Sequence, residues 1–139
     1  KLLDIGCGSG ILSILGQFLG FESIDAIDND INAIQNSIQN ISLNFNDSKI
    51  QLECKPISAI ENNEYDCVVA NIQSDILINY ANKLIDLLNN KGQLILSGIL
   101  NYEVEDVNRK FNKLLQNKVK KFSTKKRHLN EWCAIQYKI

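Results

Sequence analysis

The sequence predicts an α/β fold, doubly wound around a mostly parallel sheet, with an antiparallel hairpin at the C-terminal end. Strand-like and helix-like segments alternate along most of the chain, which is typical of a parallel sheet with connecting helices. A glycine-rich turn at residues 6–10 joins the first strand to the first helix. Residues 119–139 lack a helical period and indicate two further strands, which we expect to form the hairpin.

Five strands are predicted before this hairpin, each from a short run of strand-forming residues. The first, LLDI, indicates a buried parallel strand, and the third, IQLEC, alternates apolar with polar residues. The five runs cover residues 2–5, 23–28, 50–54, 65–70 and 93–99.

The connecting helices are predicted from apolar residues that recur every three or four positions. They are expected over residues 11–19, 31–41, 76–88 and 104–115. In the second helix, one face carries Ile31, Ile34, Ile38 and Ile41. We expect Gly92 to close the third helix, and the apolar stripes of the third and fourth helices to lie in the core.

Length and composition fit one domain over residues 1–139, because 45% apolar residues can fill a core and 22% charged residues can cover a surface. The net charge of −1 gives no overall attraction to nucleic acid or to anionic membranes. No apolar run approaches the roughly 18 residues that span a bilayer. We therefore expect no direct nucleic-acid binding, no membrane partner and a monomer.

The cysteines argue against a metal centre. Cys7, Cys54, Cys67 and Cys133 lie far apart in or beside predicted strands, and no two form a C-x-x-C pair. His128 is the single histidine, which also disfavours metal binding and Ser-His-Asp chemistry. We expect four buried thiols, no metal and a cytoplasmic setting, because a reducing compartment suits unpaired cysteines.

The glycine-rich turn is the first candidate site. Glycine allows positive φ and lets a ligand approach the backbone, while free N–H groups at the helix start can face polar ligand atoms. Dinucleotide oxidoreductases use G-x-G-x-x-G, whereas here Gly6, Gly8 and Gly10 alternate and Asp4 precedes them. This form resembles S-adenosylmethionine-dependent methyltransferases, whose cofactor lays its amino-acid end over the turn. A tight turn without a ligand is the alternative.

Asp28 is the second candidate, because it ends the second predicted strand about twenty residues beyond the glycines. A carboxylate at that place can accept hydrogen bonds from ribose hydroxyls, each worth about 1.5–3 kcal/mol. The alternative for Asp28 and Asp30 is capping of the helix that follows. We assign ribose binding to Asp28 and capping to Asp30.

Asn71 is the third candidate and follows the fourth predicted strand. In a sheet of this type the first and fourth strands flank the switch point, so we expect Asn71 to face the same crevice as Gly6 and Asp28. Its side-chain oxygen could hold the N–H bonds of an amine that attacks a methyl group. The alternative is a turn or a helix cap, since Ser74 and Asp75 open the next helix.

Beyond these sites, the chain resembles a named family. It is similar to the bacterial ribosomal protein methyltransferases of the PrmA type, which modify the eleventh protein of the large ribosomal subunit. The matching strings, in order, are LDIGCGSGILSI, AIDNDINAIQNSIQN, VVANIQSDILINYA, GQLILSGIL and EWC. The first string alone indicates only the superfamily, whereas VVANI with LSGIL and a late EW is much more specific.

The resemblance implies a seven-stranded, Rossmann-like methyltransferase domain with S-adenosyl-L-methionine as cofactor. It implies transfer of methyl groups to lysine ε-amines and the N-terminal α-amine of the ribosomal protein, with Gly6, Asp28 and Asn71 binding the cofactor. The family also has an N-terminal substrate-recognition domain, a linker and a threonine-containing segment, so we expect this chain to be the catalytic domain only. Gln73 and Ser74 stand where the family often has Leu-Ala.

Two other functions stay open. Amino-methyltransferases that act on nucleic-acid bases share the cofactor turn, but they usually carry two prolines and a stacking aromatic residue after the Asn or Asp. Here Ile72, Gln73 and Ser74 follow Asn71. The second alternative is a domain that binds the cofactor without catalysis.

Three minor features complete the sequence. The basic segment from Lys118 to Arg127 could face nucleic acid, but a solvated hairpin face is favoured because no aromatic residues suited to base stacking are interleaved. Trp132 is expected in the core or in a pocket wall. Ser97 and Gly98 end the fifth predicted strand, where small residues leave room for a substrate.

Overall fold

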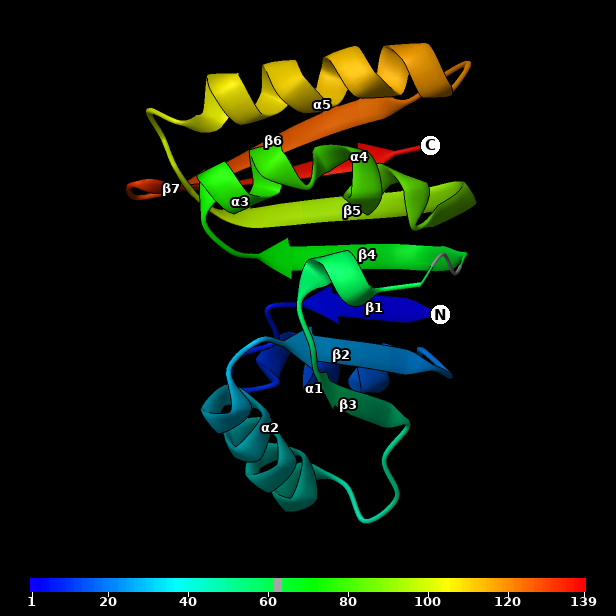
Figure 1. The fold of residues 1–139 in the computed structure, drawn as a ribbon, viewed down its shortest axis with the longest axis vertical. Helices are drawn as coiled ribbons and strands as arrows, with labels where there is room; N and C mark the ends of the chain where they lie inside the picture. The colour runs from blue at the N-terminus through cyan, green and yellow to red at the C-terminus, as the bar shows by residue number, and fades with distance from the viewer. Residues whose placement is uncertain (62–63) are drawn as a thin grey trace. The chain divides into compact units, whose positions relative to one another are not determined.

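The computed structural model describes residues 1–61 and 64–139 and contains two compact units (Figure 1). The N-terminal unit covers residues 1–61 and the C-terminal unit residues 62–139. The expectation of a single domain over the whole chain stays a prediction.

The N-terminal unit is a parallel sheet with two helices. Its elements are β1 (Leu2–Ile5), α1 (Ile11–Phe18), β2 (Ile24–Asp28), α2 (Ile31–Asn44), β3 (Ile50–Cys54) and a 3₁₀ turn, η1 (Ile57–Ala59). Strand β2 lies in the middle and pairs in parallel with β1 and with β3. Helix α1 packs on β1 and β2, and α2 packs on β2 and β3. The register aligns Ile5 with Ile27, so β1 and β2 end side by side.

The C-terminal unit combines one parallel strand pair with an antiparallel hairpin. Its elements are β4 (Tyr65–Asn71), α3 (Ser74–Asn79), α4 (Ala81–Asp86), β5 (Leu88–Leu100), α5 (Val104–Lys118), β6 (Ser123–Leu129) and β7 (Trp132–Lys138). Strand β4 pairs in parallel with β5, β5 pairs antiparallel with β7, and β7 with β6. These pairings confirm the predicted strands and the C-terminal hairpin.

Helix α5 covers the hairpin (Figure 1). Phe111 stacks on Tyr137 with ring centroids 5.6 Å apart, and the Tyr137 hydroxyl donates to Asn108 Oδ1 over 3.1 Å. Val107, Phe111 and Leu115 are fully buried along one side of the helix. The predicted apolar stripe of this helix therefore does lie in the core.

The predicted helix over residues 76–88 is wrong in its extent. The segment forms two short helices that meet at Tyr80, and both bury apolar side chains, so the helical period continues across the break. Leu88 belongs to β5 because it pairs with Tyr65 in the sheet. Gly92 therefore lies inside β5 and does not close a helix.

Burial differs from the sequence pattern in three places, and of the expectations only that of a buried Cys54 is wrong. Ile34 and Ile41 of α2 are buried, but Ile31 and Ile38 on the same predicted stripe are more than half exposed. The buried face of α2 consists of Ile34, Ser37 and Ile41, so it is rotated toward Ser37 and away from Ile31 and Ile38. Cys54 is exposed at the end of β3, whereas the other three cysteines are buried. Of the two places expected for Trp132, the core or a pocket wall, its 46% exposure excludes the core.

Candidate functional site

The glycine-rich turn lies at the carboxyl end of β1, where strand changes to helix. Gly6, Gly8 and Gly10 all have positive φ, at 69°, 55° and 81°. The N–H groups of Gly6 and Cys7 both donate to the Ile27 carbonyl, which fixes the turn against the end of β2. Gly10 is the left-handed cap from which α1 begins. Three residues with positive φ explain why glycine recurs at alternate positions.

Asp28 connects the end of β2 to this turn. Its Oδ2 accepts the N–H of Gly8 at 3.0 Å, and its Oδ1 accepts the N–H of Asp30 at 3.0 Å. Each carboxylate oxygen can accept a second hydrogen bond, so the half-buried group keeps capacity for a ligand hydroxyl. Asp30 caps α2, as predicted, because its Oδ1 accepts the N–H of Asn32 at 2.9 Å.

The outer side of Gly8 is open. A Cβ built on Gly8 would have no neighbour within 4 Å. Behind the turn, the Ser37 hydroxyl donates to the Gly8 carbonyl at 2.9 Å and holds it from the α2 side. The turn is therefore held on its α2 side and open on the other side of Gly8. A ligand that lies on the backbone requires this geometry.

Asp4 lies under the turn and is only 1% exposed. Its Oδ2 accepts the Ser13 hydroxyl at 2.6 Å, while its Oδ1 has no hydrogen-bond partner among the described residues. Burial raises the pKa of this carboxyl to about 6, although the bond from Ser13 opposes the shift, and the nearby charge of Asp28 adds to it. A buried carboxylate with an unpartnered oxygen makes the turn electrostatically receptive to a cation.

Asn71 belongs to the C-terminal unit, where it ends β4 opposite Ser97 of β5. Its side chain is exposed, and it caps no helix, because α3 begins after Gln73 without a side-chain cap. Gly98 has a φ of 75°, and a Cβ there would come within 2.8 Å of Asn71 Oδ1. The pairing between β5 and β7 shifts register between Leu96 and Ile99, so this glycine sits in an irregularity that leaves room for Asn71.

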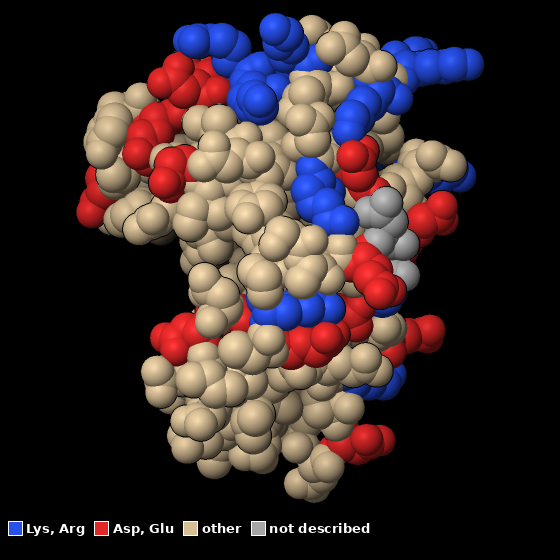
Figure 2. Space-filling model, viewed as in Figure 1, with Lys and Arg blue, Asp and Glu red and all other residues tan. Residues whose placement is uncertain are grey.

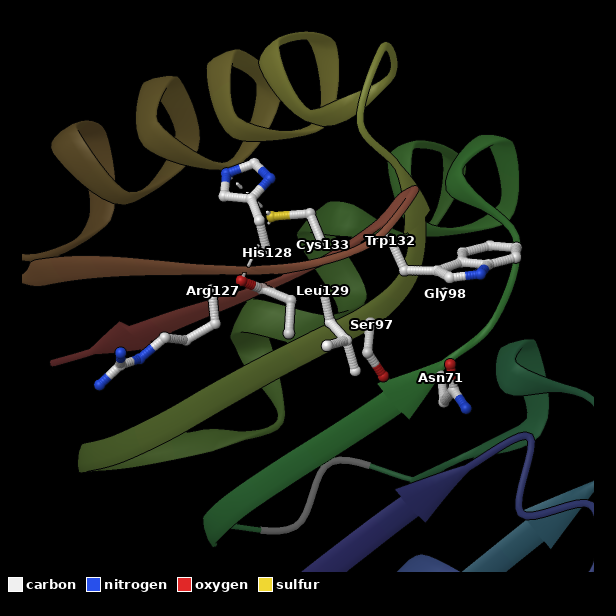
Figure 3. Close-up of a pocket in the computed structure, with 9 residues that line it drawn as sticks. Asn71, Ser97, Gly98, Arg127, His128, Leu129, Trp132 and Cys133 are labelled. Carbon is white, nitrogen blue, oxygen red and sulfur yellow. Dashed lines mark hydrogen bonds between the residues drawn. The ribbon is translucent and has the colours of Figure 1, made fainter.

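A pocket of about 560 Å³ lies beside Asn71 in the same unit (Figure 3). Its lining includes Asn71, Ser97, Gly98, Leu129, Trp132 and Ala134. The expectation that Trp132 stands in a pocket wall is confirmed, and Ser97 and Gly98 leave space there. In Figure 3, Asn71, Ser97 and Leu129 lie near one another, whereas His128 and Cys133 point toward α5.

Asn101 is a structural residue of the β6–β7 turn that the sequence did not reveal. Its backbone N–H donates to Glu131 O at 2.9 Å, and its side-chain NH₂ donates to Asn130 O at 2.8 Å. Its Oδ1 lies 2.7 Å from His128 Nδ1. Asn101 thus fastens the β6–β7 turn, whose Asn130 is the one non-glycine residue of positive φ in the part of the chain described. No spacing in the sequence distinguishes this asparagine from its many neighbours.

Five of the six predicted site residues come together in the N-terminal unit. Asp4, the three glycines and Asp28 form one continuous arrangement around the turn. Asn71 lies in the C-terminal unit, so its expected place in a crevice shared with Gly6 and Asp28 stays a prediction. No cluster of three potential metal ligands and no helix able to cross a membrane occurs within the described ranges.

Comparisons with known proteins identify the family of this chain. The family model for ribosomal protein L11 methyltransferase (PrmA) matches residues 1–139. The chain belongs to the PrmA family. A ribosomal protein L11 methyltransferase of Campylobacter concisus is 38% identical over 139 residues, which cover 98% of this chain and 46% of the relative. One of Campylobacter lari is 40% identical over 141 residues, covering 98% of this chain and 45% of the relative.

A solved structure of the family has the same fold. The ribosomal protein L11 methylase of Lactobacillus delbrueckii subsp. bulgaricus matches with a TM-score of 0.87 and 27% identity, covering 98% of this chain and 68% of that one. The fold class predicted from the sequence, an α/β methyltransferase fold with seven strands, is confirmed. The chain spans less than half the length of the curated PrmA relatives described here.

Proposed function

We propose that this chain is the cofactor-binding and catalytic part of an S-adenosylmethionine-dependent protein N-methyltransferase. Its substrates would be lysine ε-amines and the N-terminal α-amine of a large-subunit ribosomal protein, in keeping with the names of its PrmA relatives. The single observation that carries the proposal is the hydrogen bond from the Gly8 N–H to Asp28 Oδ2. It connects the open glycine turn to a carboxylate that is placed to bind ribose hydroxyls. Four free cysteines support a cytoplasmic setting.

The residues present fit S-adenosylmethionine. Asp28 would accept hydrogen bonds from the ribose hydroxyls, and the open backbone around Gly8 would carry the amino-acid end of the cofactor. The unpartnered Oδ1 of Asp4 suits a cofactor that carries an ammonium and a sulfonium, because both are cations. When bound, the cofactor supplies a methyl group that a neutral amine can attack.

We propose Asn71 as the residue that orients the attacking amine. A lysine amine with its ordinary pKa near 10.4 is almost fully protonated at pH 7, so freeing its lone pair costs roughly 4–5 kcal/mol. A mostly apolar pocket lowers that cost by disfavouring the ammonium form. The side-chain oxygen of Asn71 can accept one remaining N–H, which directs the lone pair. Gly98 keeps space for this oxygen.

The test is methyl transfer to purified ribosomal protein L11, read by mass spectrometry of the intact protein and its peptides. The proposal predicts added methyl groups on amines, and a strong loss of transfer in Asn71→Ala with little loss of stability. Methylation of RNA bases instead of protein would favour the nucleic-acid alternative. A chain that binds the cofactor but methylates no amine, even at saturating protein, would be a binding domain without catalysis.

A further inference from the structure

Positive charge is concentrated in the C-terminal part of the sequence. Between residues 109 and 127 there are nine Lys and Arg and no Asp or Glu. Over residues 62–139 there are 12 Lys and Arg against eight Asp and Glu, whereas residues 1–61 carry three against eight. The net charge of −1 is therefore the sum of a positive charge on the C-terminal unit and a larger negative charge on the N-terminal unit.

Only some of these cations have acidic partners. Lys118 pairs with Asp86, Lys126 pairs with Glu105, and Arg109 pairs with Asp106. The other six make no ion pair within the described part of the chain, and all but Lys110 are exposed. We call these six the basic edge: Lys110, Lys113, Lys120, Lys121, Lys125 and Arg127.

The basic edge surrounds the outer border of the C-terminal unit and is not confined to one face. Lys126 pairs with Glu105 of α5, so its neighbours on β6, Lys125 and Arg127, point away from α5. Helix α5 is held over the hairpin by the contact of Phe111 with Tyr137, and its Asn112 lies 3.4 Å from the Thr124 hydroxyl of β6. The segment that joins α5 to β6 carries two of the cations. Strand β6 pairs with β7 alone in this unit, so it is an edge strand. Figure 2 shows Lys and Arg side chains gathered around α5 and the hairpin.

Protection of an open edge explains only part of this charge. Lysine and arginine on an edge strand discourage pairing with other chains, which accounts for Lys125 and Arg127 on β6. It does not account for Lys113 on α5, nor for Lys120 and Lys121 in the connection. The basic edge therefore continues beyond the strand that edge protection concerns.

The charge of the basic edge favours a nucleic acid over a protein partner, because the segment 109–127 holds nine Lys and Arg and no Asp or Glu. Protein interfaces depend on buried aromatic and aliphatic anchors. No large apolar side chain among the described residues 103–128 is exposed, whereas the exposed Leu129 and Trp132 lie beside Arg127 alone, in the pocket near Asn71. A sugar-phosphate backbone needs only cations on flexible stems.

We propose that the basic edge binds the phosphate backbone of nucleic acid, without reading base sequence. The proposal replaces our expectation of no direct nucleic-acid binding. That expectation rested on the net charge and on the lack of stacking aromatic residues, and backbone contacts need neither. It does not depend on the proposed methyl transfer, because five of the six cations lie outside both the glycine turn and the pocket beside Asn71, which Arg127 lines.

The test measures binding of a fluorescently labelled, unstructured single-stranded RNA of roughly 20 nucleotides, longer than one typical binding site. Fluorescence anisotropy over a series of sodium chloride concentrations compares the wild type with two double variants. Lys121→Gln/Lys125→Gln removes two charges from the basic edge. Lys49→Gln/Lys91→Gln removes two exposed charges elsewhere, so both variants have the same net charge. Circular dichroism checks that both are folded.

We expect the basic-edge variant to bind RNA about tenfold more weakly at low salt, with a salt slope smaller by about 1.4, since each lost phosphate contact contributes about 0.7. The control variant should bind within about twofold of the wild type, and single-stranded DNA of the same sequence should behave like RNA. Equal weakening in both variants, or binding insensitive to salt, would overturn the proposal. So would binding of anionic phospholipid vesicles through Lys121 and Lys125 without any binding of RNA.

Discussion

Substitution of Gly98 by alanine should lower the free energy of unfolding more than alanine does at a glycine with open surroundings. Gly98 has a φ of 75°, in the left-handed region, where a Cβ costs about 1–2 kcal/mol. The new Cβ would also lie 2.8 Å from Asn71 Oδ1 and 3.2 Å from the Ile72 carbonyl oxygen. The Asn71 side chain can move away, but the backbone carbonyl can do so only by distorting the end of β4. Overpacking of this kind costs about 1–3 kcal/mol more.

Gly20 provides the matched control. Its φ is 90°, yet a Cβ there would have no neighbour within 4 Å, so Gly20→Ala tests the backbone strain alone. Urea denaturation gives the free energy of unfolding of both variants. We expect a loss of about 2–5 kcal/mol for Gly98→Ala and about 1–2 kcal/mol for Gly20→Ala. Losses that agree within about 0.5 kcal/mol would refute the close packing of Gly98 against the Ile72 carbonyl at the end of β4.

Three further predictions concern the glycine turn. Asp28→Ala should weaken S-adenosylmethionine binding by about 2 kcal/mol, roughly thirtyfold, whereas Asp30→Ala should lose helix stability alone; calorimetric titration of both variants compares them. Because folding raises the pKa of Asp4 from 3.8 to about 6, the protonated form stabilises the folded state. The wild type should therefore lose about 3 kcal/mol relative to Asp4→Asn as pH rises from below 4 to above 6, and parallel pH profiles of unfolding would contradict this. Ser13→Ala should raise the pKa of Asp4 further, because the hydrogen bond from the Ser13 hydroxyl to the Asp4 carboxylate lowers that pKa. NMR titration of Asp4 measures the change.

Local pattern was sufficient for strands such as β1 and β3, but not for the start of β5, which begins at Leu88 and not at residue 93. Runs such as LLDI and IQLEC matched β1 and β3 because strand length and alternation are decided by short-range chemistry. The division of residues 76–88 was not predictable in the same way. Both helices bury the same kind of side chain, and it is the pairing of Leu88 with Tyr65 that assigns Leu88 to a strand.

The candidate site was only partly predictable for a related reason. Glycine spacing and Asp28 follow from the demands of one turn, and these residues do come together. The hydrogen bond from Ser13 to Asp4, and the bonds that Asn101 makes to the β6–β7 turn, depend on tertiary contacts between segments. Leu129 likewise entered the pocket wall only because the hairpin folds beside β5. Such contacts leave no periodic trace in the sequence.

The central claim is that the glycine turn and Asp28 bind S-adenosylmethionine, and calorimetric titration of residues 1–139 tests it most directly. The same protein is titrated separately with S-adenosylmethionine and with NADH. The account predicts binding of S-adenosylmethionine alone, with a dissociation constant on the order of micromolar that rises strongly in Asp28→Ala. Binding of NADH, or S-adenosylmethionine binding that is unchanged in Asp28→Ala, would contradict it.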